Sequence, residues 1–170
     1  GRTLMLAKLD DTVLYGDRFY PLHTNRWADG TVGPHGYRHI EKFFLEGTVP
    51  TWRYACADAL LEKRIWMQPG ANTTYIYYQL TRATQPLTLT LKAMVNYRDY
   101  HHTTQGQGWR MTIVPEENGV YVSAFPEAAQ LHLTSDRAIA TESHDWYYGF
   151  DLIAERARGL DDRDDHLHAA

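Results

Sequence analysis

The segment from Leu87 to Val95 limits the possible folds more than any other part of the chain. Apolar side chains occupy every second position there, and Thr88, Thr90, Lys92 and Met94 fill the positions between them. A period of two predicts a β-strand with one face against a core. The same alternation recurs at 109–113 and 120–124, and Pro115–Gly119 supplies turn residues between those two runs. We therefore expect these two runs to form a hairpin.

Strand patterns continue through most of the chain. A second hairpin is expected from residues 12–15 and 19–22 across Gly16–Arg18. Further strands are expected at 2–9, 38–45, 60–67 and 73–81, with turns at 47–50 and 69–70. Helical spacing is found at 152–158, before Gly159. Many short strands without strand–helix alternation predict an all-β, antiparallel β-sandwich in one domain over residues 1–170, with at most one short helix near 151–158.

Composition excludes several classes of protein. A chain of 170 residues buries about 70% of its unfolded surface, so its core needs neither a disulfide nor a metal. With 17 basic and 21 acidic residues the net charge is −4, which argues against a nucleic-acid partner. No segment approaches the ~18 apolar residues of a membrane span. Cys56, the single cysteine, excludes an internal disulfide and favours a reducing compartment such as the cytoplasm.

A cluster of polar and aromatic residues follows the clearest strand. It consists of Asn96, Tyr97, Arg98, Asp99, Tyr100 and His101. Rings, a guanidinium and a carboxylate at a strand end are typical of a binding loop. The alternative is a surface loop in which Arg98 and Asp99 form an ion pair of small energetic value.

The acidic segment Asp161–His168 allows two interpretations. His166 and His168 lie on the same side of an extended chain, beside several carboxylates, which suggests a metal site. The spacing matches no calcium loop and no zinc motif. We therefore expect a charged, hydrogen-bonded tail and no bound metal.

Two other segments carry unusual residues. One of them is an aromatic set beside Asp145, which consists of Trp146, Tyr147, Tyr148 and Phe150. These rings would either form a platform for a sugar or cover one end of the sandwich. In the strand expected at 60–67, Glu62, Lys63 and Arg64 interrupt an apolar pattern. They indicate either an inter-domain surface or a solvated sheet face.

Catalytic motifs give little support for an enzyme. Cys56 has no nucleophile motif around it, and the chain contains no GxSxG, phosphate-binding or dinucleotide-binding pattern. No spacing singles out two carboxylates as the acid and base of a glycosidase. We expect neither a cofactor nor a catalytic residue in this chain.

Several ordered motifs together resemble one family. They are Asp58–Met67, Asn72–Tyr75, Asn96–His101 and Gly159–His168. They look like the N-terminal domain of bacterial and archaeal glycogen debranching enzymes, the amylo-α-1,6-glucosidases, and the likeness extends over essentially the whole chain.

The resemblance implies a large supersandwich domain, followed in the family by an (α/α)-barrel of helices that hydrolyses α-1,6 branch linkages. We expect this chain to be a fragment, incomplete at both ends, without that catalytic domain. Its expected partners are its own C-terminal catalytic domain and glycogen or another branched α-glucan. The segment 96–101 would contact sugar or the domain interface. The other interface candidates are Trp146, Asp161, Asp162, Asp165 and His166.

Two rival functions remain open at this point. One is a self-sufficient α-glucan-binding module that uses tryptophan and tyrosine rings. The other is a small enzyme or metalloprotein that uses the histidine-rich ends of the chain.

Overall fold

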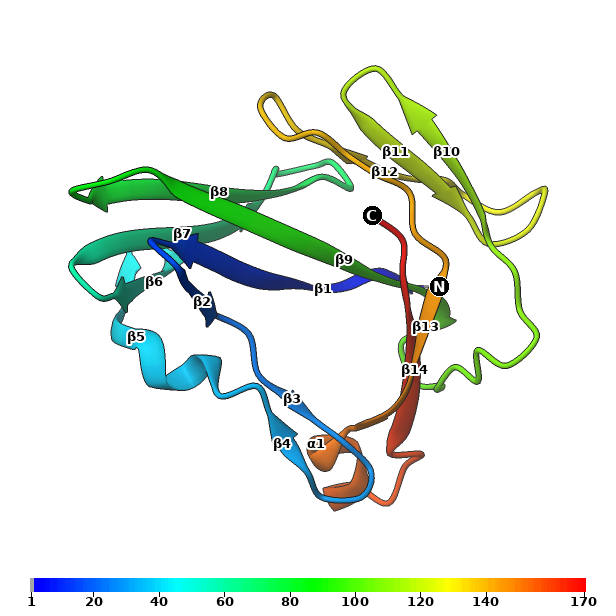
Figure 1. Cartoon of the computed structure of the whole chain (residues 1–170). Coiled ribbons are helices and arrows are strands. Elements are labelled where there is room, and N and C mark those ends of the chain that lie inside the picture. The colour runs from blue at the N-terminus through cyan, green and yellow to red at the C-terminus, as the bar shows by residue number, and fades with distance from the viewer. Residues whose placement is uncertain (1) are drawn as a thin grey trace. The chain divides into compact units, whose positions relative to one another are not determined.

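A computed structural model describes residues 2–170, and strands dominate it (Figure 1). The strands are β1 (Thr3–Tyr15), β2 (Arg18–Pro21), β3 (Asn25–Arg26), β4 (Val32–Gly33), β5 (Ile40–Glu46), β6 (Val49–Cys56), β7 (Ala59–Met67), β8 (Thr74–Arg82), β9 (Leu87–Asp99), β10 (Thr112–Glu116), β11 (Gly119–Ser123), β12 (Leu131–Thr134), β13 (Asp145–Asp151) and β14 (Arg163–His168). A 3-10 turn, η1 (Gly36–His39), and one helix, α1 (Ile153–Ala157), complete the described chain. The all-β prediction and the short helix are confirmed. No helix within residues 2–170 is long and apolar enough to cross a membrane.

The described residues form two compact units. Unit 1 contains residues 2–10, Asn25–Val32 and Leu91–Ala170, and unit 2 contains Asp11–Thr24 and Gly33–Thr90. Strands β1 and β9 supply residues to both units. A single domain over 1–170 remains a prediction.

Four antiparallel sheets build the units. The strand orders are β13-β14-β9-β1-β2, β10-β11-β12, β5-β6-β7-β8 and β3-β4. The hairpin of β1 and β2 turns through Gly16 and Asp17, because Tyr15 pairs with Arg18. Gly16 has a φ of +60°, a backbone conformation that glycine adopts without steric cost. This hairpin and strand β9 confirm the clearest sequence patterns.

The core of unit 1 lies between two sheets. Val95 of β9 and Leu167 of β14 pack in one cluster with Ile113, Val120 and Val122 of the β10-β11-β12 sheet. The predicted hairpin of β10 and β11 is confirmed, with Glu116 opposite Gly119. This packing is that of a β-sandwich.

The core of unit 2 also lies between two sheets. Val13, Tyr15 and Leu22, from the β1–β2 hairpin and the residue after it, pack against Tyr54 of β6 and Leu61 of β7. Cys56 is completely buried in this cluster. The two sheets of unit 2 therefore pack against each other through their apolar faces.

Three segments differ from their predictions. Val49 and Pro50, predicted as turn residues, begin β6 and pair with Glu46 and Leu45. Residues 36–39 form η1, so β5 begins at Ile40 and not at 38. Strand β10 begins at Thr112 and not at 109, and Pro115 and Glu116, predicted as turn residues, belong to it and pair with β11.

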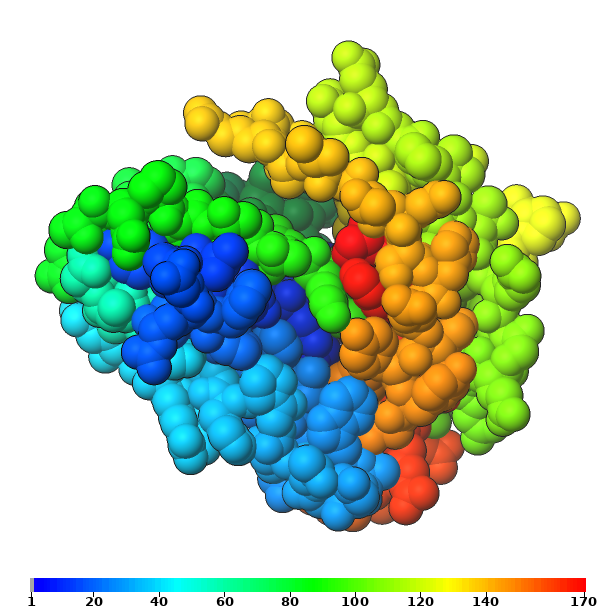
Figure 2. Space-filling view, viewed as in Figure 1, coloured from blue at the N-terminus to red at the C-terminus, as the bar shows by residue number. Residues whose placement is uncertain are grey.

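The segment after β12, for which no element was predicted, projects from the surface in Figure 2, where it is amber. Ile139 within it is almost fully exposed.

Candidate functional site

The candidate residues of unit 1 are positioned by strand β14. It lies beside β13 (Figure 1), with Leu167 opposite Trp146, and it also pairs with β9, where Leu167 lies opposite Val95. The expected charged tail at 161–168 is therefore wrong for 163–168, which form an interior strand. Asp164 and His166 are buried there because their polar atoms find partners within unit 1.

Asp164 is the centre of a buried polar network. Its side chain is fully buried, and its carboxylate accepts hydrogen bonds from Arg98 Nε at 2.9 Å and from the Thr104 backbone N–H at 2.7 Å. The Asn96 amide lies 3.4 Å from both carboxylate oxygens and donates to the backbone oxygen of Asp165 at 3.0 Å. A buried carboxylate with a guanidinium partner is stabilised only while every partner remains in place.

His166 lies in the same network. Its Nδ1 is 3.2 Å from Asn96 Nδ2, and its ring packs against Phe150 with the ring centroids 4.5 Å apart. Burial lowers the pKa of His166 to about 4. The positive charges of Lys8 and Arg98 also lower this pKa, whereas the negative charge of Asp164 raises it. The imidazole is therefore neutral at pH 7 and serves as a hydrogen-bonding group.

A second polar group in unit 1 joins β1 to β3. The Asp10 carboxylate forms an ion pair with Lys8 Nζ at 2.7 Å and accepts a hydrogen bond from Asn25 Nδ2 at 3.0 Å. Lys8 also donates to the Asn25 amide oxygen, and its ammonium group lies 4.7 Å from the centroid of the Phe150 ring. The cation thus stacks on the same ring as His166.

The candidate segment 96–101 is not a single loop. Strand β9 continues to Asp99, and alternation along it separates the side chains. Asn96 and Arg98 point into the network, and Arg98 pairs with the carboxylate of Asp164 and not with that of Asp99. The expected loop is therefore wrong for 96–99, which belong to β9. The alternative of an Arg98–Asp99 ion pair is wrong as well, because Arg98 pairs with the buried carboxylate of Asp164.

The end of the segment is exposed. The rings of Tyr100 and His101 lie 3.9 Å apart between centroids, and both residues are exposed. The Asp99 carboxylate accepts the backbone N–H of His101 at 2.9 Å, and this hydrogen bond lowers the pKa of Asp99. Tyr97 is half-buried and contacts Phe125 edge to face.

Asp165 and Trp146 connect the strands on the core side of the sheet. Asp165 accepts the backbone N–H groups of Gly106 and Gly149, both at 2.8 Å. A Cβ at Gly106 would lie 2.1 Å from the Trp146 ring, so only glycine allows this close approach. Trp146 stacks on Trp109 and donates its indole N–H to the Trp109 carbonyl at 2.9 Å.

The two remaining candidates lie near helix α1. Asp162 accepts Arg156 Nη1 at 2.9 Å, whereas Asp161 is exposed. Arg156 also binds Asp151 at 2.7 Å, and Arg26 approaches the same carboxylate at 3.0 Å. These contacts, the hydrogen bond from Arg156 first, lower the pKa of Asp151.

Sequence reasoning missed Lys8, Asp10, Asn25, Thr104, Asp151, Arg156 and Asp164. Asp164 could have been identified from the sequence, because alternation along 161–168 places it on the same face as His166. Thr104 carries no such signal, although its backbone N–H donates to Asp164 and its hydroxyl donates to Asn96 Oδ1. The other contacts join residues that are distant in sequence.

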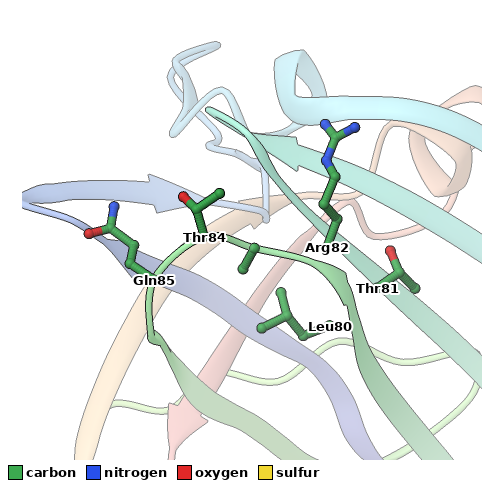
Figure 3. Close-up of a pocket in the computed structure, with 6 residues that line it drawn as sticks. Leu80, Thr81, Arg82, Thr84 and Gln85 are labelled. Atoms are coloured by element: carbon green, nitrogen blue, oxygen red, sulfur yellow. The ribbon is translucent and has the colours of Figure 1, made fainter.

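Two further features bear on chemistry. Within residues 2–170, no three His, Cys, Asp or Glu side chains are arranged to hold a metal ion. A surface hollow of about 610 Å³ in unit 2 is lined by Leu80–Gln85, whose side chains point in different directions in Figure 3. No residue of the candidate segments lines this hollow.

Comparison with known proteins assigns the family. The family model described as the N-terminal of glycogen debranching enzyme matches residues 1–170. Neither the curated proteins nor the solved structures give a match. The match covers every residue that carries the polar network of unit 1. The chain therefore belongs to the glycogen debranching enzyme N-terminal family.

Proposed function

We propose that this chain is the non-catalytic N-terminal domain of an enzyme that hydrolyses α-1,6-glucosidic branch linkages in glycogen and related α-glucans. In this role it supports the helical catalytic domain, which supplies the acid and the base. The family match supports the N-terminal role.

One observation carries the proposal that the domain is non-catalytic. Asp164, Asp165 and Asp151 each accept hydrogen bonds or ion pairs from two groups within unit 1. Glycoside hydrolysis requires two carboxyl groups about 5–10 Å apart across a substrate cleft, one of them able to release its proton. Carboxylates held by arginine and backbone N–H groups instead join strands to one another.

The exposed candidates have a different proposed role. Tyr100 and His101 present adjacent rings at the end of β9, where they would stack on a glucose ring or contact the catalytic domain. Asp161 and Asp162 would face that domain near helix α1. Asp165, His166 and Trp146 would act indirectly, by holding β13 and β14 in position.

Two assays test this function. The 170-residue chain is expected to release no glucose from a branched limit dextrin. In the complete enzyme, the double variant Tyr100→Ala/His101→Ala is expected to raise KM for the dextrin about tenfold, the loss of about one stacking contact, with an unchanged thermal midpoint. Ile139→Ala, at an almost fully exposed apolar side chain of unit 1 outside the candidate segments, is the control.

The outcomes separate the two parts of the proposal. Glucose release by the 170-residue chain would overturn the non-catalytic role. Equal KM values for the double variant and the control would remove Tyr100 and His101 from the substrate contacts.

A self-sufficient α-glucan-binding module is a second candidate function. The exposed rings of Trp66 and Tyr75 in unit 2 favour it. Calorimetric titration of the 170-residue chain with maltoheptaose tests this second candidate, because a domain that contacts glucan only together with the catalytic domain gives no heat of binding by itself.

A further inference from the structure

The β5-β6-β7-β8 sheet of unit 2 has two chemically different faces. Leu61, Lys63 and Tyr78 point toward the core, where Lys63 Nζ and the Tyr78 hydroxyl donate to Asp11 at 2.6 and 2.7 Å. Alternation places Arg64 and Trp66 of β7 on the opposite face. Their partners across the strand pair, Tyr77 and Tyr75, point the same way.

Three aromatic rings are exposed on this opposite face. Trp66 lies opposite Tyr75, with ring centroids 5.3 Å apart and ring planes at 20°. Tyr77 follows two residues along β8, so its Cα is about 6.7 Å from that of Tyr75. The exposed fractions of Trp66, Tyr75 and Tyr77 are 37%, 44% and 46%. We call these three residues the aromatic row.

Charged side chains next to the aromatic row neutralise one another. Arg53 and Arg64 both bind the buried carboxylate of Glu62, at 2.7 and 3.1 Å. Arg64 also lies 3.3 Å from Glu46. The hydrogen bond from Arg53 lowers the pKa of Glu62, so its carboxylate stays ionised. Both arginines are therefore occupied by carboxylates, and the exposed Lys42, opposite Arg53 on this face, lies 4.8 Å from the centroid of the Phe44 ring.

We propose that the aromatic row binds a neutral oligosaccharide. Its rings would stack on the C–H faces of successive sugar units, because exposed tyrosine and tryptophan combine an apolar ring with a polar edge. The exposed Gln79, opposite Glu62 on the same face, would supply hydrogen bonds to hydroxyl groups. A neutral ligand also suits a face whose two arginines are held by carboxylates. That the sugar is an α-1,4-linked glucan rests on the function proposed above.

Titration of the 170-residue chain with maltoheptaose tests the proposal. The double variant Trp66→Ala/Tyr75→Ala removes two rings and is expected to weaken binding at least about tenfold. Phe19→Ala, which removes an exposed ring of the β1–β2 hairpin in the same unit, is expected to leave affinity unchanged. Thermal unfolding of each variant verifies that the loss comes from the site.

Conservative variants allow the site to be tested even if the double variant unfolds. Trp66→Phe and Tyr75→Phe retain a ring, and Tyr75→Phe removes the hydroxyl that donates to Gln68 at 3.0 Å. Both are expected to bind maltoheptaose within about threefold of the wild type, since the ring supplies most of the contact.

A parallel titration with cellohexaose separates this site from the proposed function. Binding of either sugar that is lost in the double variant supports the aromatic row, and binding of cellohexaose alone overturns the assignment to α-glucan. No binding of either sugar, or equal affinity in the double variant and the wild type, overturns the site. Neither result depends on hydrolysis, which tests the proposed function.

Discussion

Two adjacent residues of β1, Asp10 and Asp11, contribute a buried carboxylate to different units. Asp10 belongs to unit 1, where it binds Lys8 and Asn25, and Asp11 belongs to unit 2, where it binds Lys63 and Tyr78. Because successive side chains of a strand point to opposite faces, one strand serves two separate polar centres.

The two centres differ in how widely they connect. In unit 2 the Asp11 centre lies beside an otherwise apolar cluster, and burial together with the Asp11 charge raises the pKa of Tyr78, so its hydroxyl remains a donor. Unit 1 adds a network around Asp164 and His166 that joins three segments of the chain: β9, the residues around Thr104, and β14. Both units have an apolar core, and the comparison indicates that unit 1 depends on buried hydrogen bonds over a larger part of its chain than unit 2 does.

The largest expected effect is that of Asp164→Ala. It leaves the Arg98 guanidinium and the Thr104 N–H without their buried acceptor, and we expect a loss of about 4 kcal/mol in the free energy of unfolding. Urea unfolding measures it. The control Asp161→Ala, at an exposed carboxylate two residues before β14, is expected to change stability by less than about 0.5 kcal/mol. Similar losses in both variants would contradict the central place of Asp164.

A somewhat smaller loss is expected in unit 2. Lys63→Met removes the buried cation beside Asp11 and is expected to cost about 3 kcal/mol. The double variant Asp11→Asn/Lys63→Met removes the charge as well, and Asn can still accept from Tyr78. It should therefore be more stable than Lys63→Met alone by chemical denaturation. The opposite order would show that the ion pair itself stabilises unit 2.

Acid should destabilise unit 1 through His166. Its pKa is about 4 in the folded chain and about 6.5 when unfolded, so the unfolded state binds the extra proton between these values. Stability is therefore highest above pH 6.5 and falls as the pH is lowered to 4, by up to about 3 kcal/mol from this residue. His166→Gln, which cannot take up the proton, should show a smaller loss over the same range. Parallel pH profiles for the two proteins would refute this role.

The smallest effect is expected at Cys56. Burial raises the pKa of its thiol to about 11, so a thiol reagent at pH 8 should not label the native chain. Urea that opens unit 2 should expose the thiol. Cys56→Ser places a hydroxyl in the apolar cluster and is expected to cost about 1–2 kcal/mol by urea unfolding. Rapid labelling of the native chain would contradict the packing of unit 2.

The strands could be predicted where one face is buried and the other exposed. The alternation at 87–95 predicted β9 because it reflects the burial of alternate side chains. From Ala93 onward both faces are buried, since Met94 and Asn96 are covered as well. The pattern ends there although the strand continues, and this produced the prediction of a loop.

Strand β14 could not be predicted by the same reasoning. Five of its six residues are charged or histidine, which is typical of a solvent-exposed segment. The burial of Asp164 and His166 depends on Asn96, Arg98 and Thr104, at least 60 residues away in sequence. The family resemblance included this segment among its motifs, but only coordinates give its partners.

The neighbouring carboxylates of β1 also restrict how this chain can change during evolution. Loss or gain of one residue between Lys8 and Asp11 would exchange which carboxylate faces which side. Only one of the two centres could then keep a carboxylate in place, and the other centre would fail. We therefore expect insertions and deletions to be rare in this stretch, even where point substitutions at its solvent-facing positions are tolerated.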